Sequence, residues 1–237
     1  MQVAQGSYSD QDHEFRESDP YARAKYELTL RWLPGDLAVG DTLYNVGAGG
    51  GYFNQLAASR GLRIVACEPD AATFQAASAS APPNCELHNC GLEEFARGRV
   101  PARVVVMHDV LEHIADDAFA AETLRSLVDA GGTVVLSVPA LPFLFGRHDE
   151  ELGHCRRYTP RALRRVLEPW FTFERLQWFG MASIPIAWYF SVWRRQGYPF
   201  GIGRSPLASV YGTICALESY IPEPIGTSLI ARLAPRS

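Results

Sequence analysis

Residues 42–61 (TLYNVGAGGGYFNQLAASRG) constrain the fold more than any other stretch of the chain. The run TLYNV is short and apolar, as expected for a buried strand, and a helix is predicted to begin near Tyr52. Between them, Gly47, Gly49 and Gly51 allow a sharp turn that can bring bare backbone N–H groups against a ligand. A plain strand–turn–helix packing loop is the alternative interpretation.

The spacing of these glycines argues against a dinucleotide cofactor. The loop reads G-x-G-x-G, whereas a dinucleotide loop requires G-x-G-x-x-G with Gly or Ala at the sixth position. That position is Tyr52 here. An NAD-linked oxidoreductase is therefore a disfavoured alternative.

The same stretch resembles motif I of the class I S-adenosylmethionine (SAM) dependent methyltransferases, in which the glycine loop underlies the methionine part of SAM. The resemblance implies that Asn45, Gly47, Gly49 and Gly51 contact the cofactor. Family members usually carry Asp or Glu at the position of Asn45, which can accept a hydrogen bond but brings no charge. A SAM-binding protein that regulates, or that catalyses a rearrangement without methyl transfer, is an alternative for which Asn45 is the one hint.

A second predicted strand, residues 62–67, ends in an acidic turn. Glu68 lies about 20 residues past the glycine loop, where a carboxylate can accept both ribose hydroxyls. Pro69 follows it, and Asp70 is expected to cap the next helix. We therefore place Glu68 and Pro69 in the cofactor site.

The loop after the third predicted strand (residues 86–89) is the expected adenine site. In similar methyltransferases an Asp is often found where this chain has Gly91. The resemblance thus implies that backbone groups of Gly91 or Leu92 contact the adenine.

The fourth predicted strand, residues 103–107 (RVVVM), is an unbroken apolar run, as expected at the centre of a parallel sheet. It leads into HDVLEHI, which again resembles the family. The resemblance implies that His108 and Asp109 meet the methionine portion of SAM and that His113 lies near the methyl donor. A structural role for His113 is the alternative.

Alternating strands and helices predict an α/β fold with a doubly wound, Rossmann-like sheet whose ligands lie at the carboxyl ends of the strands. A helix is expected over residues 118–128, closed by Gly131 and Gly132, with a fifth strand over 133–138. Strands over 171–178 and 227–233 would complete a seven-stranded sheet whose last strand is antiparallel.

Residues 139–160 are too polar and too broken to belong to a core. They strongly resemble the H-D-x-x-x-G-H-x-R-R-Y-T stretch of a subset of small-molecule methyltransferases (type 11/12-like). Histidine has the pKa range of a general base near neutral pH, so His148 and His154 are candidate bases beside His113, and Asp149 could orient a ring. A divalent ion on the two histidines and Asp149 is less favoured because no further ligand cluster lies nearby in sequence, and we expect no metal.

The segment between the last two strands is longer than a minimal methyltransferase needs. Its aromatic run (181–193) and a second predicted helix (209–220) suggest a helical cap over the acceptor pocket. The expected domains are a flexible N-terminus (1–19), a SAM-binding domain (20–180), the cap insertion (181–226) and a final core strand (227–237). The aromatic run could be buried against the rest of the cap, against a second subunit in a homodimer or on a membrane surface. A more specific interpretation is that it contacts a large apolar acceptor.

Composition limits the partners. A net charge of −4 gives no general attraction to nucleic acid, and no apolar run reaches the length of a membrane span. The polar N-terminus does not read as a signal peptide, and five cysteines without metal-type spacing read as reduced thiols of a cytoplasmic protein. Together with the resemblance, this predicts an enzyme that methylates a hydroxyl or amine of a small-molecule acceptor, in secondary-metabolite or glycan biosynthesis, and releases S-adenosylhomocysteine.

Overall fold

A seven-stranded sheet with the order β3-β2-β1-β4-β5-β7-β6 forms the centre of the molecule. The computed structural model describes residues 19–196 and 206–236. Strands β1 to β5 pair in parallel, while β7 is antiparallel to both β5 and β6, which confirms the predicted fold class. The strands are β1 (Thr42–Val46), β2 (Arg63–Cys67), β3 (Cys85–His88), β4 (Ala102–His108), β5 (Val128–Pro139), β6 (Phe171–Phe179) and β7 (Ser228–Pro235).

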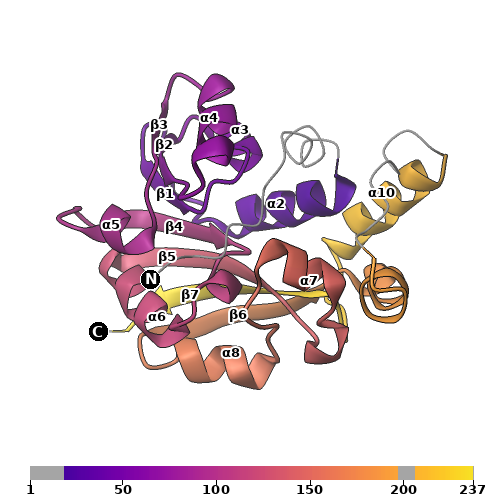
Figure 1. Cartoon of the computed structure of the whole chain (residues 1–237). Coiled ribbons are helices and arrows are strands. Elements are labelled where there is room, and N and C mark those ends of the chain that lie inside the picture. The colour runs from indigo at the N-terminus through magenta and orange to yellow at the C-terminus, as the bar shows by residue number, and fades with distance from the viewer. Residues whose placement is uncertain (1–18, 197–205, 237) are drawn as a thin grey trace.

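Helices cover both faces of this sheet (Figure 1). One face carries α2 (Pro20–Trp32) and α3 (Tyr52–Ala58), with α10 (Pro206–Glu218) packed against α2. The other face carries α5 (Leu92–Ala96), α6 (Asp117–Ser126) and α8 (Pro160–Leu167). The remaining α-helices are α4 (Ala71–Ala79), α7 (Arg147–Leu152) and the single turn α9 (Ile184–Ala187).

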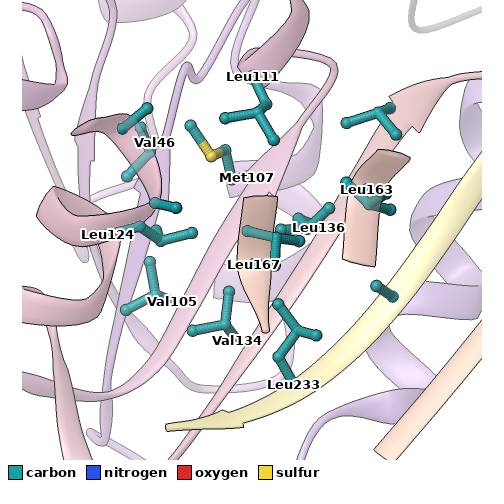
Figure 2. Close-up of a cluster of buried hydrophobic side chains, with 14 of the residues drawn as sticks. Val46, Val105, Met107, Leu111, Leu124, Val134, Leu136, Leu163, Leu167 and Leu233 are labelled. Carbon is teal, nitrogen blue, oxygen red and sulfur yellow. The ribbon is translucent and has the colours of Figure 1, made fainter. Parts of the chain in front are cut away.

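The larger core lies between the sheet and the α5, α6 and α8 layer (Figure 2). Met107 and Val105 from β4 point into it together with Leu136 of β5. Leu124 from α6 and Leu163 from α8 close it from the helix side. These side chains are at most 1% exposed, so the uninterrupted apolar strands are explained by burial on both faces.

Helix α2 begins where the sequence favours a start. Asp19 is its N-cap and accepts a hydrogen bond from the N–H of Tyr21 at 2.9 Å, while Pro20 occupies the first turn. The cap fixes the direction of the helix, which brings Tyr21 and Lys25 to the strand ends.

The expected boundary between α6 and β5 is wrong. The helix ends at Ser126, and the strand already begins at Val128, so the pair Gly131 and Gly132 lies within β5 instead of closing a helix. A Cβ on Gly132 would be 2.7 Å from the carbonyl oxygen of Arg103 on β4. Glycine is therefore required there by close strand contact at an irregular register, and not by a helix end.

The segment between β6 and β7 starts with the 3-10 turn η3 (Met181–Ser183), continues through α9 into the wide π-helical turn η4 (Trp188–Trp193), and includes α10. Trp188 and Trp193 are 48% and 62% exposed, so this aromatic run is not buried within the part of the chain that the structure describes. No helix among the described residues has the length and apolar character needed to cross a membrane. The proposed domain division stays a prediction, and residues 1–18 of its N-terminal segment (1–19) lie outside the described residues.

Candidate active site

The glycine loop after β1 adopts backbone conformations that favour glycine. Gly47, Gly49 and Gly51 have φ angles of +74°, +53° and +83°. The N–H of Gly47 donates to the carbonyl oxygen of Cys67 at 3.0 Å, which ties the loop to the end of β2. A Cβ on Gly47 would also lie 2.2 Å from Cγ2 of Val110. Conformation and packing therefore both require glycine at this position.

Glu68 joins the glycine loop at the end of β2. Its Oε2 accepts a hydrogen bond from the N–H of Gly49 at 2.8 Å, and its Oε1 accepts one from the N–H of Asp70 at 3.1 Å. The side-chain amide of Asn89 donates to the backbone oxygens of Glu68 and Pro69, at 2.8 and 3.2 Å, so the ends of β2 and β3 are held together. A carboxylate oxygen can accept more than one hydrogen bond, so this fixed carboxylate keeps acceptor capacity for ribose hydroxyls.

Gly91 and Leu92 follow β3 at this edge of the sheet, where their backbone groups are the candidate contacts for adenine. Gly91 is the N-cap of α5, and no described atom lies within 4 Å of the place where its Cβ would be. Leu92 is only 9% exposed and its side chain belongs to the core, so a ligand could reach it through its backbone alone. Adenine contact at this pair stays a prediction.

The side chain of Asn45 is buried beneath the glycine loop. Its Nδ2 donates to Oδ1 of Asn54 on α3 at 2.8 Å, which links strand β1 to the helix behind the loop. Its Oδ1 is buried and accepts no hydrogen bond from the described residues. The side chain of Asn45 therefore links strand β1 to helix α3, and its Oδ1 can still accept a hydrogen bond. The contact of Asn45 with SAM stays a prediction.

His108 turns its ring toward α2. Its Nε2 lies 2.8 Å from Oγ1 of Thr29, and the ring packs at 4.8 Å between centroids against both Tyr26 and Phe53. The residue is 6% exposed. Within the chain, the His108 side chain thus stabilises the contact between α2, α3 and β4, and its predicted cofactor contact stays a prediction.

Asp109 is held in a left-handed conformation (φ +51°) by groups from two other elements. Its Oδ2 pairs with Nζ of Lys25 on α2, and its Oδ1 accepts from Oγ of Ser137 on β5 at 2.9 Å. Burial is the largest single effect and opposes ionisation of Asp109, but the charge and hydrogen bond of Lys25, together with smaller contributions that include the hydrogen bond from Ser137, outweigh it and lower the pKa of the carboxyl. Burial is also the largest single effect on Lys25 and opposes its ionisation, but the negative charge of Asp109, together with its hydrogen bond and smaller contributions from neighbouring groups, outweighs burial and raises the pKa of that ammonium group. The pair is therefore ionised at neutral pH.

Asp149 is the centre of a hydrogen-bonded cluster within residues 139–160. It is fully buried, and its Oδ1 accepts hydrogen bonds from Nδ1 of His154 and Nε of Arg157, both at 2.8 Å. Its Oδ2 accepts from the N–H of Gly146 at 3.0 Å. Burial alone would raise the pKa of Asp149, but the hydrogen bonds from His154, Arg157 and Gly146 and the charge of Arg157 together outweigh it and lower that pKa. An ionised Asp149 keeps the proton of His154 on Nδ1 and leaves Nε2 as the nitrogen with a lone pair.

On the side of its ring opposite Asp149, His154 lies close to His113 and Glu112. The two imidazole rings lie 4.7 Å apart between centroids, at an interplanar angle of 84°. Nε2 of His154 is 3.9 Å from Oε1 of Glu112, which lies in the 3-10 turn η1 (Leu111–His113) that follows β4. The structure therefore brings three of the predicted catalytic residues together (His113, His154 and Asp149).

His148 is fixed to the segment after β6. Its backbone N–H donates to Oγ of Ser191 in η4 at 3.2 Å, and the neighbouring Gly146 approaches so closely that a Cβ there would lie 2.4 Å from the carbonyl oxygen of Ser191. Arg195 adds an ion pair to Glu150 at 2.7 Å. Helix α7 and η4 are therefore docked on each other, and a catalytic role for His148 stays a prediction.

Lys25 and Glu112 were missed as site residues. Lys25 is the only lysine in the sequence and lies one helical turn after Tyr21, on a face that otherwise carries apolar and hydroxyl groups. Glu112 immediately precedes His113 within the motif already singled out, and it is completely buried. Burial, as the largest cause, together with the charge of Asp109, raises the pKa of Glu112 well above its usual value.

The chain is similar to known methyltransferases in sequence and in fold. Residues 18–169 match the family model described as a methyltransferase domain. An uncharacterized methyltransferase of Mycobacterium leprae (strain Br4923) is 29% identical over 167 residues, which cover 65% of this chain. The match spans 61% of that relative's length.

Solved structures share the fold at low sequence identity. Phosphoethanolamine N-methyltransferase 2 of Haemonchus contortus, solved in complex with SAM, superposes with a TM-score of 0.67 at 13% identity and covers 97% of this chain and 58% of its own. The cyclopropane synthase MmaA2 of Mycobacterium tuberculosis gives a TM-score of 0.65 at 17% identity, with 98% and 96% covered.

Proposed function

Because this chain belongs to the class I SAM-dependent methyltransferases, we propose that it transfers the methyl group of SAM to a hydroxyl or amine of a small-molecule acceptor. SAM is the methyl donor, and S-adenosylhomocysteine is the product. The nucleophile attacks the methyl carbon in line with the sulfonium, so the new bond to carbon forms as the C–S bond breaks and its electrons return to sulfur. Since the sulfonium is its own leaving group, the protein mainly positions and desolvates the two reactants.

The observation that carries this proposal is the contact between Glu68 and the glycine loop. Two backbone N–H groups, of Gly49 and Asp70, hold a nearly buried carboxylate at the carboxyl end of β2. Such a carboxylate can accept both ribose hydroxyls, while the three left-handed glycines of the neighbouring loop carry no Cβ and so let a ligand approach their backbone closely. A ribose bound there would direct the sulfonium along the strand ends toward β4.

The acceptor side is proposed to lie around His113 and His154. His113 lies in the turn η1 after β4, and His154 follows α7 in the segment after β5. A hydroxyl must lose its proton in the reaction, and the lone pair of Nε2 on His154, oriented by Asp149, is a suitable acceptor for it. A neutral amine can attack before it loses its proton, so the presence of this Asp–His pair favours a hydroxyl.

The test is a calorimetric titration of SAM, and separately of NADH, into the purified protein. We expect SAM to bind in the micromolar range and NADH not to bind. Transfer of labelled methyl groups to a panel of small hydroxylated and aminated acceptors would then identify the acceptor class. Absence of SAM binding would refute the proposal, whereas SAM binding without transfer to any acceptor would favour a regulatory SAM-binding protein.

A further inference from the structure

Glu112 has an unusual environment for a buried acid. It is 0% exposed, and both of its carboxylate oxygens are buried without accepting a hydrogen bond from the described residues. Buried polar atoms nearly always have a partner, because leaving one unsatisfied costs about 1–3 kcal/mol or more for a charged group. A group that the described chain does not supply would therefore fit against this carboxylate.

Two imidazoles face the same point. One nitrogen each of His113 and His154 and one oxygen of Glu112 all lie within 4.8 Å of one another. Ligands of a single ion, each about 2.1 Å from it, can be up to about 4.2 Å apart, so small side-chain rotations would bring these three atoms onto one ion. Two imidazole nitrogens and one carboxylate oxygen suit zinc, manganese, iron or cobalt better than magnesium or calcium, which prefer oxygen ligands alone.

The backbone and a supporting carboxylate hold these groups in place. The N–H of Cys155 donates to the carbonyl oxygen of Glu112 at 2.8 Å, which joins the turn after β4 to the segment after α7. Asp149 binds Nδ1 of His154 and so directs its Nε2 toward Glu112. A carboxylate behind a histidine ligand is the usual supporting arrangement in metal sites. Asp149 is itself fixed by Arg157 and the backbone of Gly146, and it is not counted among the ligands.

We propose that Glu112, His113 and His154 bind one divalent transition-metal ion, with Asp149 as a positioning residue. The sequence predicted no metal because no further ligand cluster lies near the two histidines and Asp149 along the chain, whereas the fold brings Glu112 to His113 and His154. Three protein ligands leave coordination positions open for an acceptor oxygen.

The use of this ion in catalysis rests on the proposed function. A bound cation lowers the pKa of a coordinated hydroxyl, so the acceptor releases its proton to solvent and attacks the SAM methyl group as an alkoxide or phenoxide. The oxygen–carbon bond forms, the carbon–sulfur bond breaks, and neutral S-adenosylhomocysteine leaves. Nε2 of His154 is then a metal ligand instead of the base.

Metal binding itself is tested without SAM or acceptor. The full-length protein is stripped with a chelator, and Zn²⁺, Mn²⁺ and Co²⁺ are titrated into it by calorimetry, with the Co²⁺ absorption spectrum as a second readout. We expect one ion per chain for at least one of the metals. Glu112→Gln and His113→Ala should each weaken it by at least about 100-fold, more than the 10- to 100-fold typical of a supporting residue.

The controls separate the outcomes. His88→Ala removes a histidine that pairs with Glu86 on β3 and should leave the metal affinity unchanged. Circular dichroism and a SAM titration on each metal-free variant show whether it is folded. No saturable binding of any of the three metals to the wild-type protein, or equal affinity in the folded Glu112→Gln and His113→Ala variants, would overturn the metal site. SAM binding without metal binding refutes the metal site alone, and metal binding without SAM binding refutes the proposed function alone.

Discussion

The ammonium group of Lys25 and the carboxylate of Asp109 form an ion pair between helix α2 and the carboxyl end of β4. The lysine side chain is 5% exposed and that of Asp109 is 26% exposed, so both charges are largely removed from water. Oγ of Ser137 on β5 donates to the second oxygen of the carboxylate at 2.9 Å. The pair therefore fixes α2 across two central strands, beside the edge where the cofactor is proposed to bind.

Removing the lysine charge should destabilise the fold. Lys25→Met leaves Asp109 without its partner, and breaking a buried pair in this way costs about 3–5 kcal/mol, with the lower end expected here because Asp109 is partly exposed. Chemical denaturation of Lys25→Met, Asp109→Asn and the double variant forms a double-mutant cycle. A coupling free energy of about 1–3 kcal/mol is expected, and additive effects of the two changes would contradict the pair's role.

The same pair sets a pH dependence of stability. The pKa of Asp109 is lowered in the folded state, so its contribution is present above the unfolded value of about 3.9 and is lost as pH falls below it. The pKa of Lys25 is raised, so its contribution is present below the unfolded value of about 10.4 and is lost as pH rises beyond it. The difference in free energy of unfolding between wild type and the double variant should be flat from about pH 5 to 9. A difference that changed steadily across that window would contradict the assignment.

Loss of the Glu68 carboxylate should weaken SAM binding. A hydrogen bond to a charged group contributes about 1.5–3 kcal/mol, and two ribose hydroxyls are proposed to bind there. Glu68→Ala is therefore expected to raise the dissociation constant for SAM by about 100-fold or more, measured by calorimetry. Glu122→Ala changes an exposed glutamate on α6 and should leave it unchanged. Equal affinities of the two variants would place the ribose elsewhere.

Gly47→Ala should destabilise the protein through two separate effects. A non-glycine residue at φ +74° is strained, and the new Cβ would lie 2.2 Å from Cγ2 of Val110, so a loss of at least about 2 kcal/mol is expected in thermal or chemical unfolding. Adding Val110→Ala removes the clash but not the strain, so it should restore only part of the loss. Gly91→Ala is the matched control, since its φ is −82° and its Cβ position is open. Its effect should stay within about 0.5 kcal/mol.

Local signals in the sequence were sufficient for much of the fold. Asp19 followed by Pro20 is a local signal for the start of α2, and the apolar run in residues 103–107 predicted the central strand. The helix start depends on a hydrogen bond between neighbouring residues, and the strand is recognisable because a run buried on both faces is apolar at every position. The pair Gly131–Gly132 was misread because glycine serves a helix end and a close strand contact equally well, and only the neighbouring backbone of Arg103 distinguishes them.

The sequence by itself determined the alternation of strands and helices, the glycine loop and the position of Glu68 beside it. Residues at the carboxyl ends of parallel strands must share one edge of the sheet, whatever the details of packing. Only the tertiary structure decided that Lys25 pairs with Asp109, and that Glu112 lies beside a histidine 42 positions further along the chain. Such contacts depend on how helices and loops pack across the sheet, and neither the period of a helix nor that of a strand specifies which side chains meet there.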